Sequence, residues 1–373
     1  MTMPAFIHGL DLSRSFYTDA VAPILAEHYP QLTYAAGLLA TGSETLGFDT
    51  PRSMDHWWGP RLEIFLRSDD FTPELRNEIR AVLGERLPFE FRGFPTHMQE
   101  VDRATGSVFM ASTNQRPVNH LVRVTTARAF LTNYIGAQPL DEPLSLGQWL
   151  AMPEQHLRTV ASGGIWHDAP GELSRARELL HWYPDQLWRY LLRAQWRRIE
   201  QEEAFPGRCV EVDDELGSRV VAARLVRELM HLAFLLERQY MPYSKWLGTA
   251  FARLQCAETL RPRLLGALAA TDWSEREQQL SAAYEIVADT HNKLELTEPV
   301  AAQVSPFYGR PFLVIHGDRF AAALERTITD DDVKRLPRYV GNTTQWADST
   351  DLLSNPLWCN PLSSLYAEMV PSR

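Results

Sequence analysis

The chain changes its hydrophobic pattern once, near residue 140, and this change limits its fold more than any other feature. Before that point, short alternating runs typical of strands lie between helical patterns. After it, the periodicity is mostly that of amphipathic helices. The stretch between them, IGAQPLDEPLSLGQWLAMP, is rich in proline and glycine and is typical of a linker. We therefore expect an α+β fold in which a mixed-sheet N-terminal domain is followed by a helical C-terminal domain.

The expected domains have boundaries near residues 140 and 300. Residues 1–140 form the mixed-sheet domain, residues 141–300 form the helical domain, and residues 301–373 form an extension that packs back on the core. Two runs predict strands, RLEIFL at 61–66 and HLVRVTT at 120–126.

Helices are predicted on both sides of the boundary. Residues 72–87 have amphipathic spacing, and Thr72 before Pro73 is a suitable N-cap. Long helical patterns follow at 185–203, 213–240 and 274–294.

Composition excludes several classes of protein. Hydrophobic residues make up 45% of the 373 residues, which is too many for a mainly disordered chain, and the net charge of −10 argues against a general nucleic-acid binder. Cys209, Cys256 and Cys359 have no CxxC spacing, so they give no zinc motif and fit a reducing compartment. Neither a signal peptide nor a membrane-spanning run is recognisable. We expect a cytoplasmic protein with neither a membrane nor a nucleic acid as its partner.

The most informative stretch is residues 42–66, GSETLGFDTPRSMDHWWGPRLEIFL. Gly42 and Ser43 offer backbone N–H groups with little side chain in the way, which suits an anion. Asp55 follows as a candidate metal ligand. Two metal ions that clamp a phosphoryl group need at least two carboxylates on one side, for example at i and i+2 of a strand. Here Trp57 occupies the second position.

This stretch resembles the signature of the nucleotidyltransferase superfamily, and its wider pattern is similar to the family of domain of unknown function 4037. Further similar segments are FIHGLDLSRSFYTDAVAPIL, DELGSRVVAARLVRELM, YSKWLGTAFARL and QWADSTDLL. The resemblance implies a nucleotidyltransferase-like core followed by a helical domain. It also implies departures, because the family carries Asp-His-Asp-Trp where this chain has Asp55 to Trp58, and a glutamate where it has Arg123.

Two of the three acids implied by the resemblance are thus replaced, and we expect a diverged, metal-independent enzyme. It would act on a small anionic substrate bearing sulfate, phosphate or a nucleotide, by group transfer or elimination. A biosynthetic example of such chemistry is aziridine formation by sulfate elimination. The candidate anion-binding residues are Gly42, Ser43, Trp57, Arg61, Arg123, Tyr243 and Lys245. Asp55 and His56 are the candidate catalytic residues, since histidine can exchange protons near neutral pH.

Two alternatives remain open. Glu44, Asp49 or Glu63 could replace the missing acids and hold Mg²⁺ for nucleotidyl transfer; no cofactor is expected otherwise. The chain could also be a non-catalytic protein that binds a nucleotide or a protein partner, and a partner subunit is left open in either case.

Three further groups have both a functional and a structural interpretation. Arg224, Arg227 and His231 share one helix face, but a face of salt bridges involving Glu228 is favoured. Arg189, Arg193 and Arg197 recur every four residues, which favours a solvated face. His167 and Asp168 are expected in a turn-rich loop between the domains, where the histidine would either reach a ligand or cap the following helix.

Overall fold

The computed structural model describes residues 4–39, 42–102 and 107–369. The chain forms two compact units. The first contains Met1–Leu144 and His156–His181, and the second contains Ser145–Gln155 and Trp182–Arg373. The chain therefore leaves the first unit, returns to it within helix α6 (Glu154–Ala161) and leaves it again, instead of crossing once at a single linker. Each unit is described by itself.

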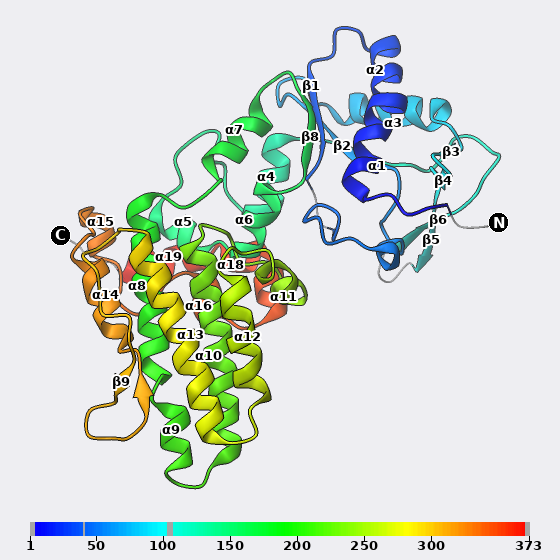
Figure 1. Cartoon of the computed structure of the whole chain (residues 1–373). Coiled ribbons are helices and arrows are strands. Elements are labelled where there is room, and N and C mark those ends of the chain that lie inside the picture. Colours follow the sequence, from blue (N-terminus) through cyan, green and yellow to red (C-terminus); the bar gives the residue numbers. More distant parts are fainter. Residues whose placement is uncertain (1–3, 40–41, 103–106, 370–373) are drawn as a thin grey trace. The chain divides into compact units, whose positions relative to one another are not determined.

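The first unit is built on a four-stranded mixed sheet (Figure 1). Its strands are β1 (Tyr34–Leu38), β2 (Arg61–Leu66), β7 (Leu121–Thr126) and β8 (Gly164–Asp168), in the order β7-β2-β1-β8. Strand β1 is antiparallel to β2 and to β8, whereas β2 and β7 are parallel. The strands predicted at 61–66 and 120–126 are confirmed.

One face of this sheet is covered by the N-terminal helices and α3. These are α1 (Gly9–Phe16), the π-helical turn Tyr17–Val21, α2 (Ala22–His28) and α3 (Pro73–Arg86). Alternate strand side chains such as Leu62, Ile64 and Val122 are buried there in one hydrophobic core. Helix α3 begins as predicted, since Thr72 Oγ1 accepts a hydrogen bond from the N–H of Leu75 at 3.1 Å.

The opposite face carries the other set of alternating residues. Phe65 packs against Phe130 of α4 (Ala127–Ile135) with a ring-centroid separation of 5.6 Å, and Arg61, Glu63 and Arg123 share this face. The remaining elements of the unit are η2 (Pro51–Ser53), β3 (Glu90–Phe91), β4 (Phe94–Pro95), β5 (Met98–Asp102), β6 (Ser107–Met110) and α7 (Glu172–Leu179).

The second unit is helical, as predicted, and completes the α+β fold. Figure 1 shows its long helices running side by side. They are α8 (Asp185–Glu202), α10 (Glu215–Leu236), α12 (Ala257–Ala269), α13 (Trp273–Lys293) and α14 (Gly317–Glu325). The predicted stripe of α8, including Leu187 and Leu191, is fully buried. Helix α10 ends at Leu236, earlier than the predicted residue 240.

Short elements surround this bundle. They are α5 (Leu146–Ala151), α9 (Phe205–Val210), η3 (Ser244–Trp246), α11 (Leu247–Phe251), β9 (Ser305–Pro306), β10 (Leu313–Val314), α15 (Asp331–Lys334), α16 (Thr343–Trp346), α17 (Thr350–Ser354), α18 (Pro356–Cys359) and α19 (Leu362–Met369). Helix α5 corrects the linker prediction, because Ser145 caps a helical turn inside the proline-rich stretch.

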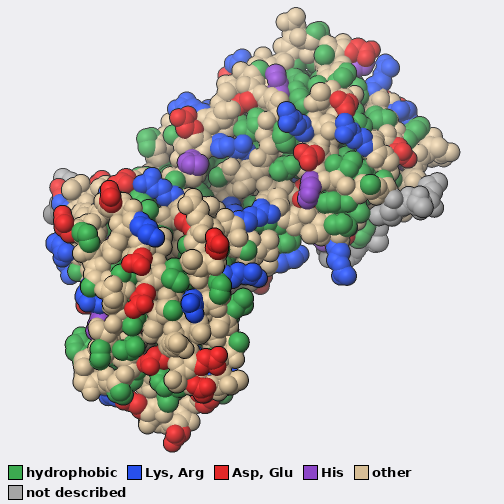
Figure 2. All heavy atoms as spheres, viewed as in Figure 1, with side chains coloured by type: hydrophobic (Ala, Val, Ile, Leu, Met, Phe, Trp, Pro, Cys, Tyr) green, Lys and Arg blue, Asp and Glu red, His purple; other side chains and the backbone are tan. Residues whose placement is uncertain are grey.

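The surface of the second unit agrees with the acidic composition. Figure 2 shows basic and acidic side chains interspersed on the visible face, with acidic ones frequent toward α9. Within the described residues, no helix combines the length and the apolar character that crossing a bilayer requires.

Candidate functional site

The candidate site of the first unit lies on the face of β2 and β7 that carries Arg61, Glu63 and Arg123. Glu63 on β2 is the register partner of Arg123 on β7, and on the other side it faces Gly37 of β1. Paired residues of neighbouring strands point to the same face, as do residues i and i+2 of one strand. Arg61, Glu63 and Arg123 therefore lie together.

Arg61 is neutralised by an acid from the turn that follows the Gly-Ser pair. Its Nε donates to Glu44 Oε1 at 2.9 Å, and both side chains are almost fully buried. Burying an arginine beside a carboxylate satisfies both charges, provided that the geometry is good. Arg61, a predicted anion ligand, and Glu44, an alternative metal ligand, thus pair with each other. Each of them already has a protein partner.

The environment of Glu63 is less favourable for a charged carboxylate than that of Glu44. It is 3% exposed, and its Oε2 accepts a hydrogen bond from the N–H of Leu39 at 3.2 Å. Burial raises the pKa of the Glu63 carboxyl above its usual value, and the guanidinium groups of Arg61 and Arg123 offset this effect only in part. Glu63 is therefore a candidate for retaining a proton that a carboxyl group in water would release, and for giving it up in a reaction.

Arg123 differs from Arg61 because it is exposed. Among the residues that the structure describes, it makes no hydrogen bond or ion pair, and its only resolved electrostatic interaction is with Glu63. A guanidinium group with free donors is well suited to a sulfate, phosphate or carboxylate.

The Gly-Ser turn retains part of the expected anion cradle. Neither Gly42 nor Ser43 donates a backbone hydrogen bond to any described residue, although their carbonyl groups accept bonds from Thr45 and Phe48. Gly42 has φ +138°, and a Cβ there would lie 2.6 Å from both Arg61 Nη2 and Glu44 Oε2. Only glycine fits this position.

Asp49, another alternative metal ligand, has a structural role. Its Oδ2 accepts the N–H of Gly9 at 2.7 Å, and His8 Nδ1 lies 3.1 Å from Oδ1. It therefore satisfies the N-terminus of α1. Across the described residues, no group of three or more His, Cys, Asp or Glu side chains is arranged to hold a metal ion.

Residues 55–58 correct one prediction. They form a bend and turn before β2, not a strand, so Asp55 and Trp57 do not occupy i and i+2 of one strand face. Trp57 has φ +60° and is exposed, whereas Trp58 is buried against Phe94. The turn forms here because Gly59 and Pro60 interrupt the extended backbone before Arg61.

The two candidate catalytic residues lie in this turn. His56 Nδ1 lies 3.4 Å from Asp55 Oδ2, and both side chains are more than half exposed. They contact each other in solvent and do not reach into the buried group around Glu63 in any contact that the structure records. Asp55, which the sequence suggests as a metal-binding acid, thus lies in a surface turn.

Tyr243 and Lys245 belong to the second unit. The Lys245 ammonium is exposed and lies 4.8 Å from the ring centroid of Trp246, a cation–π contact. Tyr243 and Ser244 line a pocket together with Arg227 of α10 and Asp348. This pocket contains one of the predicted ligand residues, Tyr243, while Lys245 stays outside its lining.

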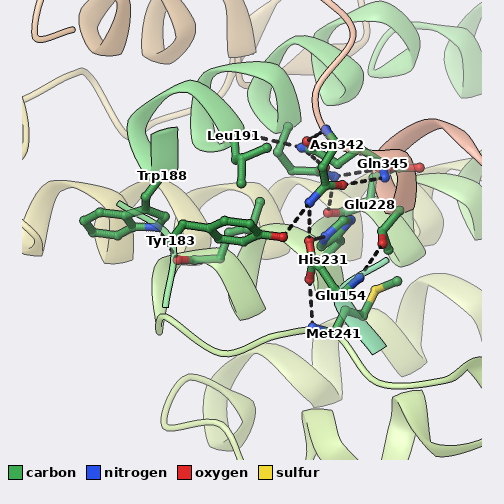
Figure 3. Close-up of polar contacts among 12 residues, drawn as sticks. Glu154, Tyr183, Trp188, Leu191, Glu228, His231, Met241, Asn342 and Gln345 are labelled. Atoms are coloured by element: carbon green, nitrogen blue, oxygen red, sulfur yellow. Dashed lines mark hydrogen bonds and ion pairs between the residues drawn. The ribbon is translucent and has the colours of Figure 1, made fainter. Parts of the chain in front are cut away.

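A buried polar network, drawn in Figure 3, lies behind one wall of this pocket. Its centre is Glu154, which is completely buried and accepts from the Met241 N–H at 2.7 Å and from Asn342 Nδ2 at 2.8 Å. His231 Nε2 lies 2.8 Å from Glu154 Oε1. Burial alone would raise the pKa of Glu154, but His231 and these hydrogen bonds outweigh it and hold the pKa below its usual value.

The network was not recognised from the sequence apart from His231. Asn342 also binds Tyr183 Oη at 3.0 Å, and Gln345 Nε2 donates to Gln195 Oε1 at 2.9 Å. These contacts join residues up to 188 positions apart, so spacing could not reveal them. A polar residue in an otherwise apolar helical run, such as His231, was the available signal.

The favoured interpretation of Arg224 and Arg227 as members of a salt-bridged face is confirmed, since they pair with Glu202 and Asp348. The partner of Glu228 and the environment of Arg193 differ from the expectation. Glu228 pairs with Arg198 of α8 at 2.9 Å, not with Arg224 or Arg227. Arg193 is buried instead of solvated and lies over the ring of Tyr190 at 5.0 Å. Helix–helix packing overrides surface patterning there, because α8 is covered on several sides.

His167 and Asp168 lie in strand β8, not in a turn-rich loop. Asp168 Oδ2 accepts hydrogen bonds from the N–H and hydroxyl of Ser174, at 2.8 and 2.7 Å, in the first turn of α7. The first turn of α7 is thus held by Asp168 and not by His167. His167 packs beside Tyr34, with ring centroids 4.7 Å apart.

Comparison with known proteins supports only part of the resemblance. No curated protein matches the chain. The matched family segment includes Glu154, His231 and Tyr243, whereas the Gly-Ser turn, Asp55, Arg123 and Asn342 lie outside it. The family model described as Domain of unknown function (DUF4037) matches residues 149–247, and this match supports the family that the sequence resembles.

Proposed function

We propose that the chain is a diverged enzyme with a nucleotidyltransferase-like core that binds a small anionic substrate without a divalent metal ion. The observation that carries the proposal is Arg123, an exposed guanidinium group without a hydrogen-bond or ion-pair partner among the described residues. It is the register partner of Glu63 and lies on the same face of the sheet. The substrate would carry sulfate, phosphate or a nucleotide, and the reaction would be group transfer or elimination.

The residues of this site have different roles in the proposed reaction. Arg123 binds the anion and stabilises negative charge as it develops on a leaving group. Glu63 has a raised pKa and can exchange a proton with a reacting group brought close to it. The N–H groups of Gly42 and Ser43 add donors for the same anion. Arg61 keeps Glu44 neutralised, which limits repulsion of the anion.

Metal-dependent nucleotidyl transfer is the alternative, and the geometry favours it less. Of its three candidate acids, Glu44 pairs with Arg61 and Asp49 binds the start of α1. Glu63 alone is a poor site for two metal ions, which need several carboxylate ligands.

A thermal-shift experiment tests the proposal. Inorganic sulfate, inorganic phosphate and a nucleoside triphosphate are each added with Mg²⁺ and, separately, with a chelator. We expect at least one of them to raise the melting temperature equally in both conditions, since ligand binding to the folded state stabilises it. The stabilisation should be lost in Arg123→Ala and kept in Arg86→Ala, which removes an exposed arginine from the end of α3.

The outcomes separate the three functions. Stabilisation by the triphosphate that disappears with chelator supports the metal-dependent enzyme and contradicts our proposal. Anion binding that survives Arg123→Ala also contradicts it. If the anions bind through Arg123 but no group transfer or elimination is found, the chain is a binding protein.

A further inference from the structure

The pocket of the second unit contains a pair of opposite charges. Arg227 Nη2 of α10 lies 3.1 Å from Asp348 Oδ1, and the two side chains are 30% and 83% exposed. Exposed ion pairs of this kind contribute little to stability because water and salt screen them. Each side chain can therefore release the other and bind an oppositely charged group of a ligand instead.

An apolar surface lies next to this pair. Met241, Pro242, Leu247 and Leu353 line the same pocket. These side chains offer hydrophobic contact to a short branched hydrocarbon group of a small molecule that lies at the mouth of the pocket.

The walls of the pocket are held in place from behind. The N–H of Met241 donates to Glu154 Oε2 at 2.7 Å, and the N–H of Glu154 donates to Thr344 Oγ1 at 2.9 Å. Both Met241 and Thr344 line the pocket. The buried network therefore fixes the pocket before a ligand arrives, which lowers the entropic cost of binding.

We propose that this pocket binds a free α-amino acid with a branched apolar side chain. Arg227 binds its carboxylate, Asp348 binds its ammonium group, and the side chain lies on the apolar surface. A simple anion at Arg227 would leave the Asp348 carboxylate unpaired beside it, and the two negative charges would repel each other. A zwitterion satisfies both groups.

Three compounds of matched shape test this assignment. They are leucine, 4-methylpentanoate, which lacks the ammonium group, and 3-methylbutylamine, which lacks the carboxylate. Saturation-transfer NMR on the full chain measures their dissociation constants. We expect leucine to bind at least about tenfold more tightly than either analogue, since a hydrogen bond to a charged group is worth about one order of magnitude in affinity.

Single substitutions test whether leucine binds at Arg227 and Asp348. Arg227→Gln and Asp348→Asn should each weaken leucine binding about tenfold. Arg224→Gln is the matched control, because Arg224 lies on the same helix but pairs with Glu202 outside the pocket lining. It should leave the dissociation constant of leucine unchanged.

Three results would overturn the proposal: no saturable binding of leucine, equal binding of leucine and 4-methylpentanoate, or equal effects of the Arg224 and Arg227 variants. Arg227 and Arg123 belong to different units. Failure of leucine binding therefore leaves the thermal-shift test of the anion site unaffected.

Discussion

Glu63 in the first unit and Glu154 in the second are buried to almost the same extent, yet their pKa values shift in opposite directions. Glu63 is 3% exposed and its pKa is raised, whereas Glu154 is fully buried and its pKa is lowered. Desolvation raises the pKa in both cases and is the largest single cause. Burial alone thus cannot explain the difference.

The hydrogen-bond partners explain it. Glu154 accepts from Met241 and Asn342 and contacts His231, so its charged form is well solvated by the protein. Among the described residues, Glu63 accepts one hydrogen bond, from Leu39, and the nearby Glu44 carboxylate raises its pKa further. The first arrangement binds chain segments together, and the second leaves a carboxyl whose proton can move.

Replacing Glu154 by alanine should produce the largest effect. The variant leaves the Met241 N–H, the Asn342 amide and the His231 ring without their acceptor in a buried site. We expect the free energy of unfolding in urea to fall by about 3–5 kcal/mol. Glu298→Ala, at an exposed glutamate of the same unit, should change it by less than about 0.5 kcal/mol.

The same residue gives a pH dependence. Because the folded state lowers the pKa of Glu154 below its unfolded value of 4.5, its stabilisation is present above that pH and is lost as the pH falls further. The difference between the wild-type chain and Glu154→Ala should shrink in acid. A difference that stays constant between neutral pH and acid would contradict the charged network.

Glu63→Gln should raise the free energy of unfolding, whereas Glu154→Ala lowers it, and the effect of Glu63→Gln should be smaller. Glutamine keeps an acceptor for the Leu39 N–H and removes the charge that burial disfavours. The raised pKa of Glu63 means that the wild-type chain loses stability as the pH rises from 4.5 through the folded-state value. Melting curves across this range should show the variant gaining relative to the wild-type chain as the pH rises.

The control for this test is Glu85→Gln on α3, an exposed glutamate whose substitution should give no such trend. A variant that loses stability at every pH, by as much as a Glu154 variant, would show that Glu63 is a structural ion-pair member like Glu154.

The fold class and most long elements could be predicted from the sequence. The spacing of apolar residues is local, so strand β2 and helices α3, α8 and α13 were found close to their observed bounds. Helix α5 was missed because proline and glycine around it suggest a linker, while a Ser145 capping box still starts a helix.

The candidate site was harder to predict, since it depends on contacts between distant residues. The motif drew attention to Asp55 and Trp57, but the turn at Gly59 and Pro60 removes them from the strand. Glu63, named from the sequence only as an alternative metal ligand, takes the central place because β2 pairs in register with β7. The pairing of Arg61 with Glu44 depends on how the turn folds back, which no residue spacing reveals.

We expect the smallest effect at Asp55 and His56, the exposed pair in the turn before β2. This pair adds a solvent-exposed environment to the comparison of Glu63 with Glu154. Asp55 and His56 contact each other at 3.4 Å with both side chains open to solvent, so neither carries a large desolvation cost. Asp55→Asn should change the free energy of unfolding by less than about 0.5 kcal/mol. It should also leave stabilisation by sulfate or phosphate intact, because the anion is expected at Arg123. Loss of that stabilisation in Asp55→Asn, measured beside Arg123→Ala, would show that the turn closes over the anion and that the sheet face around Arg123 is only part of the site.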